Sequence, residues 1–209
     1  MKKLHRTTAG LVAALAASAT ALTALPAEAA QGNRSVAKVL AADGNRFDRN
    51  WGDFDITEKA VLAVLEAKPD SAVTLLTQGS KRATVFVPTD NAFRLLVGDL
   101  TGTKPGTEAK TFDAVAGLGI DTVEAVLLYH VVAGRTLVSE KVVGADGSYV
   151  RTAAGTTFKV VVNHEGVVKI QDKDRNDENA EAIPRLLDLN RGNKQVAHGI
   201  DRVLRPVDL

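Results

Sequence analysis

Three histidines beyond the first thirty residues are the side chains best suited to acid–base or metal chemistry in this sequence. His130 falls seven residues after Val123 on the apolar face of a predicted helix, and His198 shares one face of a predicted strand with Ile200. Buried imidazoles are usually hydrogen-bonded within a core, so we expect structural roles for both. His164 lies in a predicted turn and should be exposed. A metal-binding or acid–base role for His130 or His198 is the alternative.

An acidic stretch begins like a calcium-binding loop. Asp172, Asp174 and Asn176 stand at alternate positions, as the first three ligands of such a loop do. The complete loop also needs glycine at its sixth position and glutamate at its twelfth, where this sequence has Asp177 and Ile183. We therefore expect no metal in this protein, and we keep these three residues as a candidate metal site against the alternative of a solvated acidic loop.

Other catalytic and cofactor signatures are missing from the sequence. There is no cysteine nucleophile, no G-x-S-x-G elbow and no glycine-rich phosphate loop after a strand. No basic block with interleaved aromatic residues indicates a nucleic-acid surface. We expect a protein that is not an enzyme, has no cofactor and does not bind nucleic acid.

The first 29 residues have the composition of a secretory signal peptide. A basic start is followed by the apolar stretch 9–25 and by an A-x-A exit that predicts cleavage after Ala29. A membrane anchor is the alternative, but the stretch is short for a bilayer span and contains Gly, Ser and Thr. No second apolar run follows. We expect a secreted or cell-wall-associated protein with no membrane span after cleavage.

The remainder has the size of one ordinary domain, about 180 residues. The whole chain carries a formal net charge of +1. Lys2, Lys3 and Arg6 against Glu28 contribute +2, so the exported part is near −1. Without cysteine it is free of disulfides, and packing alone must hold the fold. We divide the chain into the signal peptide 1–29, a polar leader 30–34 and one domain over 35–209.

A strand-to-helix corner is the most sharply defined element. Residues 83–87 are β-branched or aromatic and predict a strand, which Pro88 ends because it lacks an N–H. Thr89 is a natural N-cap for the following helix, and Asp90 in its first turn suits the helix dipole. Phe93 then opens the apolar stripe of the helix.

The other elements indicate a helical first half and a β-rich second half. Helices are predicted from capping-box spacings at Asp55–Glu58 and Asp121–Glu124, the latter helix carrying His130, and over 73–76 and 108–116. The loop 42–55 should be pinned by its aromatic residues. Predicted β runs cover 136–139, 148–153, 156–163, 167–171, 186–189 and 195–204, with turns at 163–166 and 190–193. This order of elements predicts an α+β domain.

Three stretches resemble the signatures of the fasciclin-like domain family. They are TVFVPTDNAF at 84–93, LLYHVVAG at 127–134 and VAHGIDRVLRPVDL at 196–209, in the family's order. The resemblance covers roughly residues 35–209. Gly199 departs from it, because the family often has a branched aliphatic residue there. The motif residues, mainly structural by this resemblance, are Thr84, Phe86, Pro88, Thr89, Asp90, Phe93, Tyr129, His130, His198, Ile200, Asp201, Leu204 and Pro206.

The resemblance implies two β-sheets at a steep angle, forming a wedge with helices along one side. It also implies an extracellular binding or adhesion module whose partner is another protein or a cell-surface polysaccharide. Integrin binding in animal members has been assigned to an Asp-Ile motif and to the Tyr-His region, and only Tyr129-His130 is matched here.

Three hypotheses about function follow from the sequence. The first is a secreted adhesion module, which predicts an exposed apolar or aromatic patch. The second is a secreted scaffold that binds a small molecule or metal ion, which predicts a concave pocket with converging polar groups. The third is a histidine-dependent enzyme, which predicts a perturbed His130 or His198 in such a pocket.

Overall fold

The structure is a computed structural model that describes residues 31–44, 46–175 and 177–207. The predicted signal peptide lies outside the described residues. Within them, no helix is both long enough and apolar enough to span a bilayer.

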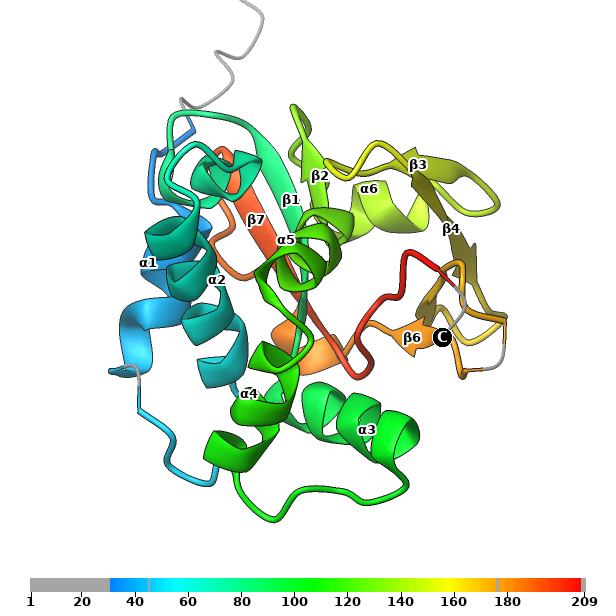
Figure 1. Cartoon of the computed structure of the whole chain (residues 1–209). Coiled ribbons are helices and arrows are strands. Elements are labelled where there is room, and N and C mark those ends of the chain that lie inside the picture. Colours follow the sequence, from blue (N-terminus) through cyan, green and yellow to red (C-terminus); the bar gives the residue numbers. More distant parts are fainter. Residues whose placement is uncertain (1–30, 45, 176, 208–209) are drawn as a thin grey trace, which may run out of the picture. The chain divides into compact units, whose positions relative to one another are not determined.

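Helices precede most of the strands along the chain (Figure 1). The α-helices are α1 Val36–Leu40, α2 Asp55–Ala67, α3 Asp90–Thr101, α4 Glu108–Ala116, α5 Ile120–Tyr129 and α6 Ser139–Val143. Short 3-10 helices are η1 Ala41–Asp43, η2 Ala72–Thr77 and η3 Pro184–Leu186. The strands are β1 Ala83–Pro88, β2 Val131–Ala133, β3 Tyr149–Arg151, β4 Thr157–Val162, β5 Val168–Gln171, β6 Ala180–Glu181 and β7 Gln195–Ile200. The α+β prediction is confirmed.

The first sheet brings the three sequence motifs together. Its strand order is β2-β1-β7, so β1 is central. β1 runs antiparallel to β2, with Val85 opposite Val131, and parallel to β7, with Phe86 opposite His198. Each of the three strands comes from one motif, so the stretches that resemble the family form one continuous structural unit.

The second sheet is antiparallel throughout, in the order β3-β4-β5-β6. The turn predicted at 163–166 joins β4 to β5, and Gly166 adopts a positive φ of 81° that a side chain would disfavour. By alternation, Phe158 and Ile170 point inward, where they pack with Phe86 of the first sheet and Tyr129 at the end of α5. The core between the sheets therefore depends on side chains from two of the motifs.

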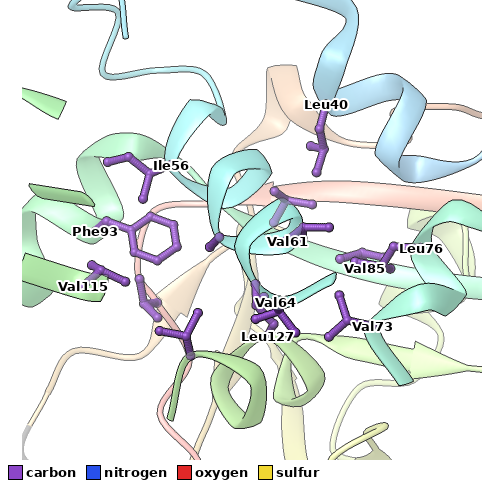
Figure 2. Close-up of a cluster of buried hydrophobic side chains, with 14 of the residues drawn as sticks. Leu40, Ile56, Val61, Val64, Val73, Leu76, Val85, Phe93, Val115 and Leu127 are labelled. Carbon is purple, nitrogen blue, oxygen red and sulfur yellow. The ribbon is translucent and has the colours of Figure 1, made fainter. Parts of the chain in front are cut away.

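A second hydrophobic core lies among helices α2, α3, α4 and α5 and the first sheet (Figure 2). Ile56, Val61 and Val64 project from α2 toward Phe93 of α3 and Leu127 of α5. The apolar periodicity of these helices is what produces this arrangement, and it places the helices on one side of β1 and β7.

Both predicted capping boxes are wrong. Asp55 is the first residue of α2 rather than its N-cap, and the carboxylate that accepts from the α2 backbone is Asp90, whose Oδ1 lies 2.9 Å from Ile56 N. α5 begins at Ile120 behind Gly119, and Glu124 instead bonds the side chains of Lys68 and Ser71. A tertiary contact thus takes the place of the local cap in α2, and in α5 tertiary contacts engage the glutamate that was predicted to cap the helix.

The corner at the end of β1 is confirmed, with one correction. Thr89 is the N-cap of α3, but its side chain makes no capping hydrogen bond. The first N–H groups of the helix, those of Asp90 and Asn91, donate to the carbonyls of Asp53 and Trp51 at 3.0 and 2.9 Å. The 42–55 loop therefore caps α3, and its aromatic anchors are as predicted: Phe47 lies 5.9 Å from the Phe112 ring.

Two predicted strands are absent from the described residues. Residues 136–139 run into α6 without joining a sheet, because side chains hold their backbone: the Thr84 hydroxyl accepts from Leu137 N at 2.8 Å. Residues 186–189 form the end of η3 and a single bridge from Leu189 to Ala197. The predicted strand 195–204 ends at Ile200.

Candidate functional site

A polar hollow of about 410 Å³ lies over the second sheet and is closed on one side by the 172–179 loop. The strand register builds its floor. Tyr149 pairs with Lys159 on the neighbouring strand, and Lys159 pairs with Gln171 on the next, so the three side chains form a row across β3, β4 and β5. Tyr149 is 70% exposed, the largest value among the exposed large hydrophobic residues described. The row presents an aromatic ring, an ammonium group and an amide to solvent.

Arg205 fixes the loop that borders the hollow. Its buried guanidinium donates to Asp174 Oδ2 through Nη1 at 2.8 Å, and its Nη2 lies 3.1 Å from Asp177 Oδ2. Nη2 also reaches Asp99 Oδ2 at 2.8 Å, and Arg205 N donates to Asp172 Oδ2 at 2.6 Å. The acidic loop is therefore held by an arginine from the closing motif, whose guanidinium pairs with Asp174 and Asp177.

This arrangement bears directly on the candidate metal site. Asp172 and Asp174 do lie together, since Asp172 Oδ1 accepts from Asp174 N at 3.0 Å, whereas Asn176 is outside the described residues. Burial raises the pKa of Asp172 to about 6, and the carboxylates of Asp174 and Asp177 add to this against two backbone donors. Because Arg205 already bonds both aspartates, the geometry favours a salt-bridged loop over the metal reading.

Three cations and three carboxylates line the hollow, and they differ in whether they have an ion-pair partner. Lys159, Lys173 and Arg175 line it, and in the part of the chain that the structure describes none of the three forms an ion pair. The carboxylates of the loop, by contrast, are engaged by Arg205. A hydroxyl-rich or anionic ligand would therefore meet hydrogen-bond donors and uncompensated positive charge.

The Tyr-His motif lies beneath this sheet. The Tyr129 hydroxyl donates to the Thr157 carbonyl of β4 at 3.1 Å, and its ring meets Phe158 edge-on at 6.3 Å. Burial raises the pKa of Tyr129 well above its ordinary value, and the charge of Asp172 contributes. Tyr129 is thus a support for β4, with its hydroxyl turned into the protein.

His130 makes two hydrogen bonds inside the protein. Nδ1 lies 2.7 Å from the Val126 carbonyl, and Nε2 accepts from Leu204 N at 2.8 Å. Since Nε2 accepts, the proton of the neutral ring is on Nδ1. Burial lowers the pKa of His130 to about 4, against the opposing effect of the bond to Val126. Both partners lie outside the strand-to-helix corner at 83–90: one comes from α5 and the other from the segment after β7.

His198 is also fully bonded within the described structure. Its Nε2 lies 2.8 Å from the Leu137 carbonyl, and its Nδ1 accepts from Asp188 N at 3.3 Å. Burial lowers its pKa. The ring borders a small apolar hollow of about 190 Å³, but neither nitrogen is left for a substrate. His164 is exposed, as predicted.

The remaining motif residues hold the frame of the first sheet. Thr84 Oγ1 donates to the Arg135 carbonyl at 2.9 Å, and the Pro88 carbonyl accepts from Thr57 Oγ1 at 3.0 Å. Asp201 Oδ1 accepts from Glu181 N at 2.7 Å and links the sheets. The others fill space: Phe86, Phe93, Ile200 and Leu204 are buried, and Pro206 is partly buried.

Sequence reasoning did not identify the row of Tyr149, Lys159 and Gln171 or the role of Arg205. The row depends on strand register, which the turn at 163–166 and the alternation in 156–163 could have indicated. Arg205 stands between two recognised motif residues, yet nothing local in the sequence reveals that its partners are Asp99 and Asp174.

Comparison with known proteins adds two findings. Residues 59–206 match the model of the Fasciclin domain. Among solved structures, the chain is similar to a FAS1 domain pair from the insect cell adhesion molecule Fasciclin I, with 19% identity and a TM-score of 0.46. The match covers 68% of this chain and 49% of that one, so the chain spans about half the length of the solved structure. No curated protein matches.

Proposed function

The chain belongs to the fasciclin domain family, and on this premise we propose that it is a secreted binding module that attaches to an acidic polysaccharide of a cell surface. Fasciclin domains are adhesion-related and generally non-enzymatic modules. In this chain the ligand lies along the hollow over the second sheet. The anionic groups of the ligand face Lys159, Lys173 and Arg175, which line the hollow.

The observation that carries the proposal is the row of Tyr149, Lys159 and Gln171. An exposed tyrosine ring offers a rigid apolar face against which a sugar ring can lie. Ammonium and amide groups beside it donate hydrogen bonds to hydroxyl and carboxylate oxygens. Lys173 and Arg175 extend the positive charge along the border of the hollow. A polymer can follow such an open, polar surface without being enclosed.

The other two hypotheses have less support. An enzyme using histidine would need a ring nitrogen directed at a substrate, whereas both nitrogens of His130 and of His198 are bonded within the protein. For a small apolar ligand, the hollow beside His198 measures about 190 Å³, which is below the usual range of about 300–1,000 Å³ for such sites.

Binding of the purified protein to an acidic and a neutral polysaccharide tests the proposal. Polygalacturonate and dextran are suitable probes in a sedimentation assay. We expect binding to the acidic polymer that weakens as salt is raised, because exposed charges are screened. Tyr149→Ala and Lys159→Ala should each weaken it about tenfold, equivalent to about 1.4 kcal/mol. Lys110→Ala, an exposed lysine on α4, is the matched control and should bind as wild type.

Unfolding measurements must accompany the binding assay. Because Tyr149 is exposed, its replacement should change the free energy of unfolding by no more than about 0.5 kcal/mol. Equal binding of dextran and polygalacturonate, or full binding by both hollow variants, would contradict the proposal.

A further inference from the structure

Five carboxylates gather where three helices begin, on elements other than those that form the hollow. Asp55 is the first residue of α2, Asp90 the first of α3 and Glu108 the first of α4. Asp48 and Asp53 come from the loop that caps α3. We call these five residues the acidic junction. Nothing in the family motifs accounts for it, since Asp90 alone belongs to one of them.

The spacing of the carboxylate oxygens suits an oxygen-coordinated cation. Asp53, Asp55 and Asp90 each offer an oxygen within 4.8 Å of the other two, and Asp48, Asp55 and Glu108 do the same. Calcium binds oxygens at about 2.3–2.6 Å, so ligands around one ion lie at most about 5 Å apart. Asp55 belongs to both groups and is therefore the centre of the junction.

Two of these side chains are buried and only half satisfied. Asp90 is fully buried; its Oδ1 accepts from Ile56 N, whereas its buried Oδ2 has no N–H donor and the side chain beside it is another acid, Asp53. Glu108 is 2% exposed; its Oε2 accepts from Arg49 N at 3.1 Å, but its buried Oε1 has no donor. A buried carboxylate oxygen without a partner is costly, so each points to a missing positive group.

The protein itself does not supply that group to Asp90 or Glu108. In residues 31–44, 46–175 and 177–207, no lysine or arginine lies within ion-pair distance of either side chain. The helix N-termini are also capped within the protein: the N–H groups of Asp90 and Asn91 donate to loop carbonyls, and Lys110 N donates to Thr107 Oγ1. The nearest charged neighbours of Asp90 are instead the like charges of Asp53 and Asp55.

We propose that the acidic junction binds one divalent cation of the calcium type, with Asp53, Asp55 and Asp90 as carboxylate ligands and Glu108 beside them. The donors are all hard oxygens, which suits calcium better than zinc or copper. The cation joins the 48–53 loop to the start of α2 and α3 and removes the repulsion among the buried acids.

Thermal unfolding of the purified protein at pH 7.5 tests this inference. The protein is first treated with EDTA and dialysed, and then calcium or magnesium chloride is added. A ligand present at about 100 times its dissociation constant should raise the unfolding midpoint by at least about 5 °C. We expect that shift with calcium, a smaller one with magnesium, and one calcium per chain by calorimetry.

Matched variants locate the effect. Asp90→Asn keeps an oxygen for Ile56 N but removes the charge, so the metal-free variant should be at least as stable as wild type and should lose the calcium shift. Asp113→Asn, an exposed acid on α4, should keep it. Asp172→Asn in the other acidic loop should also keep it. A shift lost in Asp172→Asn and kept in Asp90→Asn would overturn the proposal. A wild-type protein whose unfolding midpoint does not change when calcium is added would also overturn it.

Discussion

Replacing His130 with alanine removes a ring that joins two distant segments. Nδ1 donates to the Val126 carbonyl near the end of α5, and Nε2 accepts from Leu204 N after β7. In the variant, the Leu204 N–H loses its acceptor. Water cannot easily replace it, because Leu204 and residue 130 are at most 2% exposed. The substitution leaves the backbone bond from Phe86 N to the residue 130 carbonyl available. Its effect should therefore come from the side chain alone.

The size of the loss follows from these contacts. Each buried group left without a partner costs about 1–3 kcal/mol, and two such groups are created. The vacated ring adds a cavity cost of roughly 2 kcal/mol or more. We expect a total of about 4–8 kcal/mol, a large part of the roughly 5–15 kcal/mol that holds a typical domain.

The pH dependence gives a second, independent magnitude. The pKa of His130 is about 4 in the folded protein against 6.5 for the free side chain. Between these values the unfolded chain binds a proton that the folded chain does not, so the stability contribution is complete above pH 6.5 and is lost as pH falls toward 4. The difference corresponds to about 3 kcal/mol. Subtracting the His130→Ala curve from the wild-type curve should reveal this slope, because carboxyl groups contribute equally to both.

Urea unfolding of both proteins at several pH values is the assay, with His164→Ala as the control. His164 is exposed, so its removal should change the unfolding free energy by no more than about 0.5 kcal/mol. A His130→Ala protein as stable as wild type that has lost polysaccharide binding would refute the reasoning. His130 would then be a binding residue, and its two hydrogen bonds would have little energetic value.

Three further predictions concern the core, a glycine and export. Phe93→Ala should cost about 3–5 kcal/mol in chemical denaturation, since the ring is 3% exposed; a stable variant would mean that α3 is not anchored by it. Gly199→Val should destabilise by at least about 1–3 kcal/mol, because a Cβ at Gly199 would lie 2.6 Å from Leu186 Cβ and 3.2 Å from Phe54 Cζ; unchanged thermal stability would show that the neighbours yield. N-terminal sequencing of protein recovered from the medium or cell wall should begin at Ala30, and a retained Met1 would disprove the signal peptide.

Local patterns in the sequence predicted the helices and the corner well because those elements are determined locally. The run at 83–87, Pro88 and the apolar spacing of α3 act within a few residues of one another, and all three appear in the structure. The predictions failed where a residue distant in the sequence determines how a helix begins. The cap of α2 comes from Asp90, 34 residues beyond Ile56, and no capping-box pattern can show that.

The candidate site was less accessible to prediction than the fold. Tyr149, Lys159 and Gln171 are unremarkable in sequence and become a row only through the register of three strands. The Asp172–Asp174 stretch was noticed for its spacing, but its partner Arg205 lies about thirty residues away. A site formed on the surface of a sheet, or by a buried ion pair, depends on the tertiary structure and therefore cannot be identified from local sequence patterns.

The parallel pairing of β1 with β7 has a consequence for how the protein folds. Ala83 pairs with Gln195, so the whole second sheet and four helices form one loop that must close before the pair exists. Closing a loop of this length costs about 4 kcal/mol of chain entropy, and such non-local contacts give folding times of milliseconds to seconds. We expect slow refolding in a stopped-flow experiment that follows Trp51, the only tryptophan of the chain. Because β1 pairs with residues 195–200, the first sheet cannot be completed until the end of the domain has been synthesised.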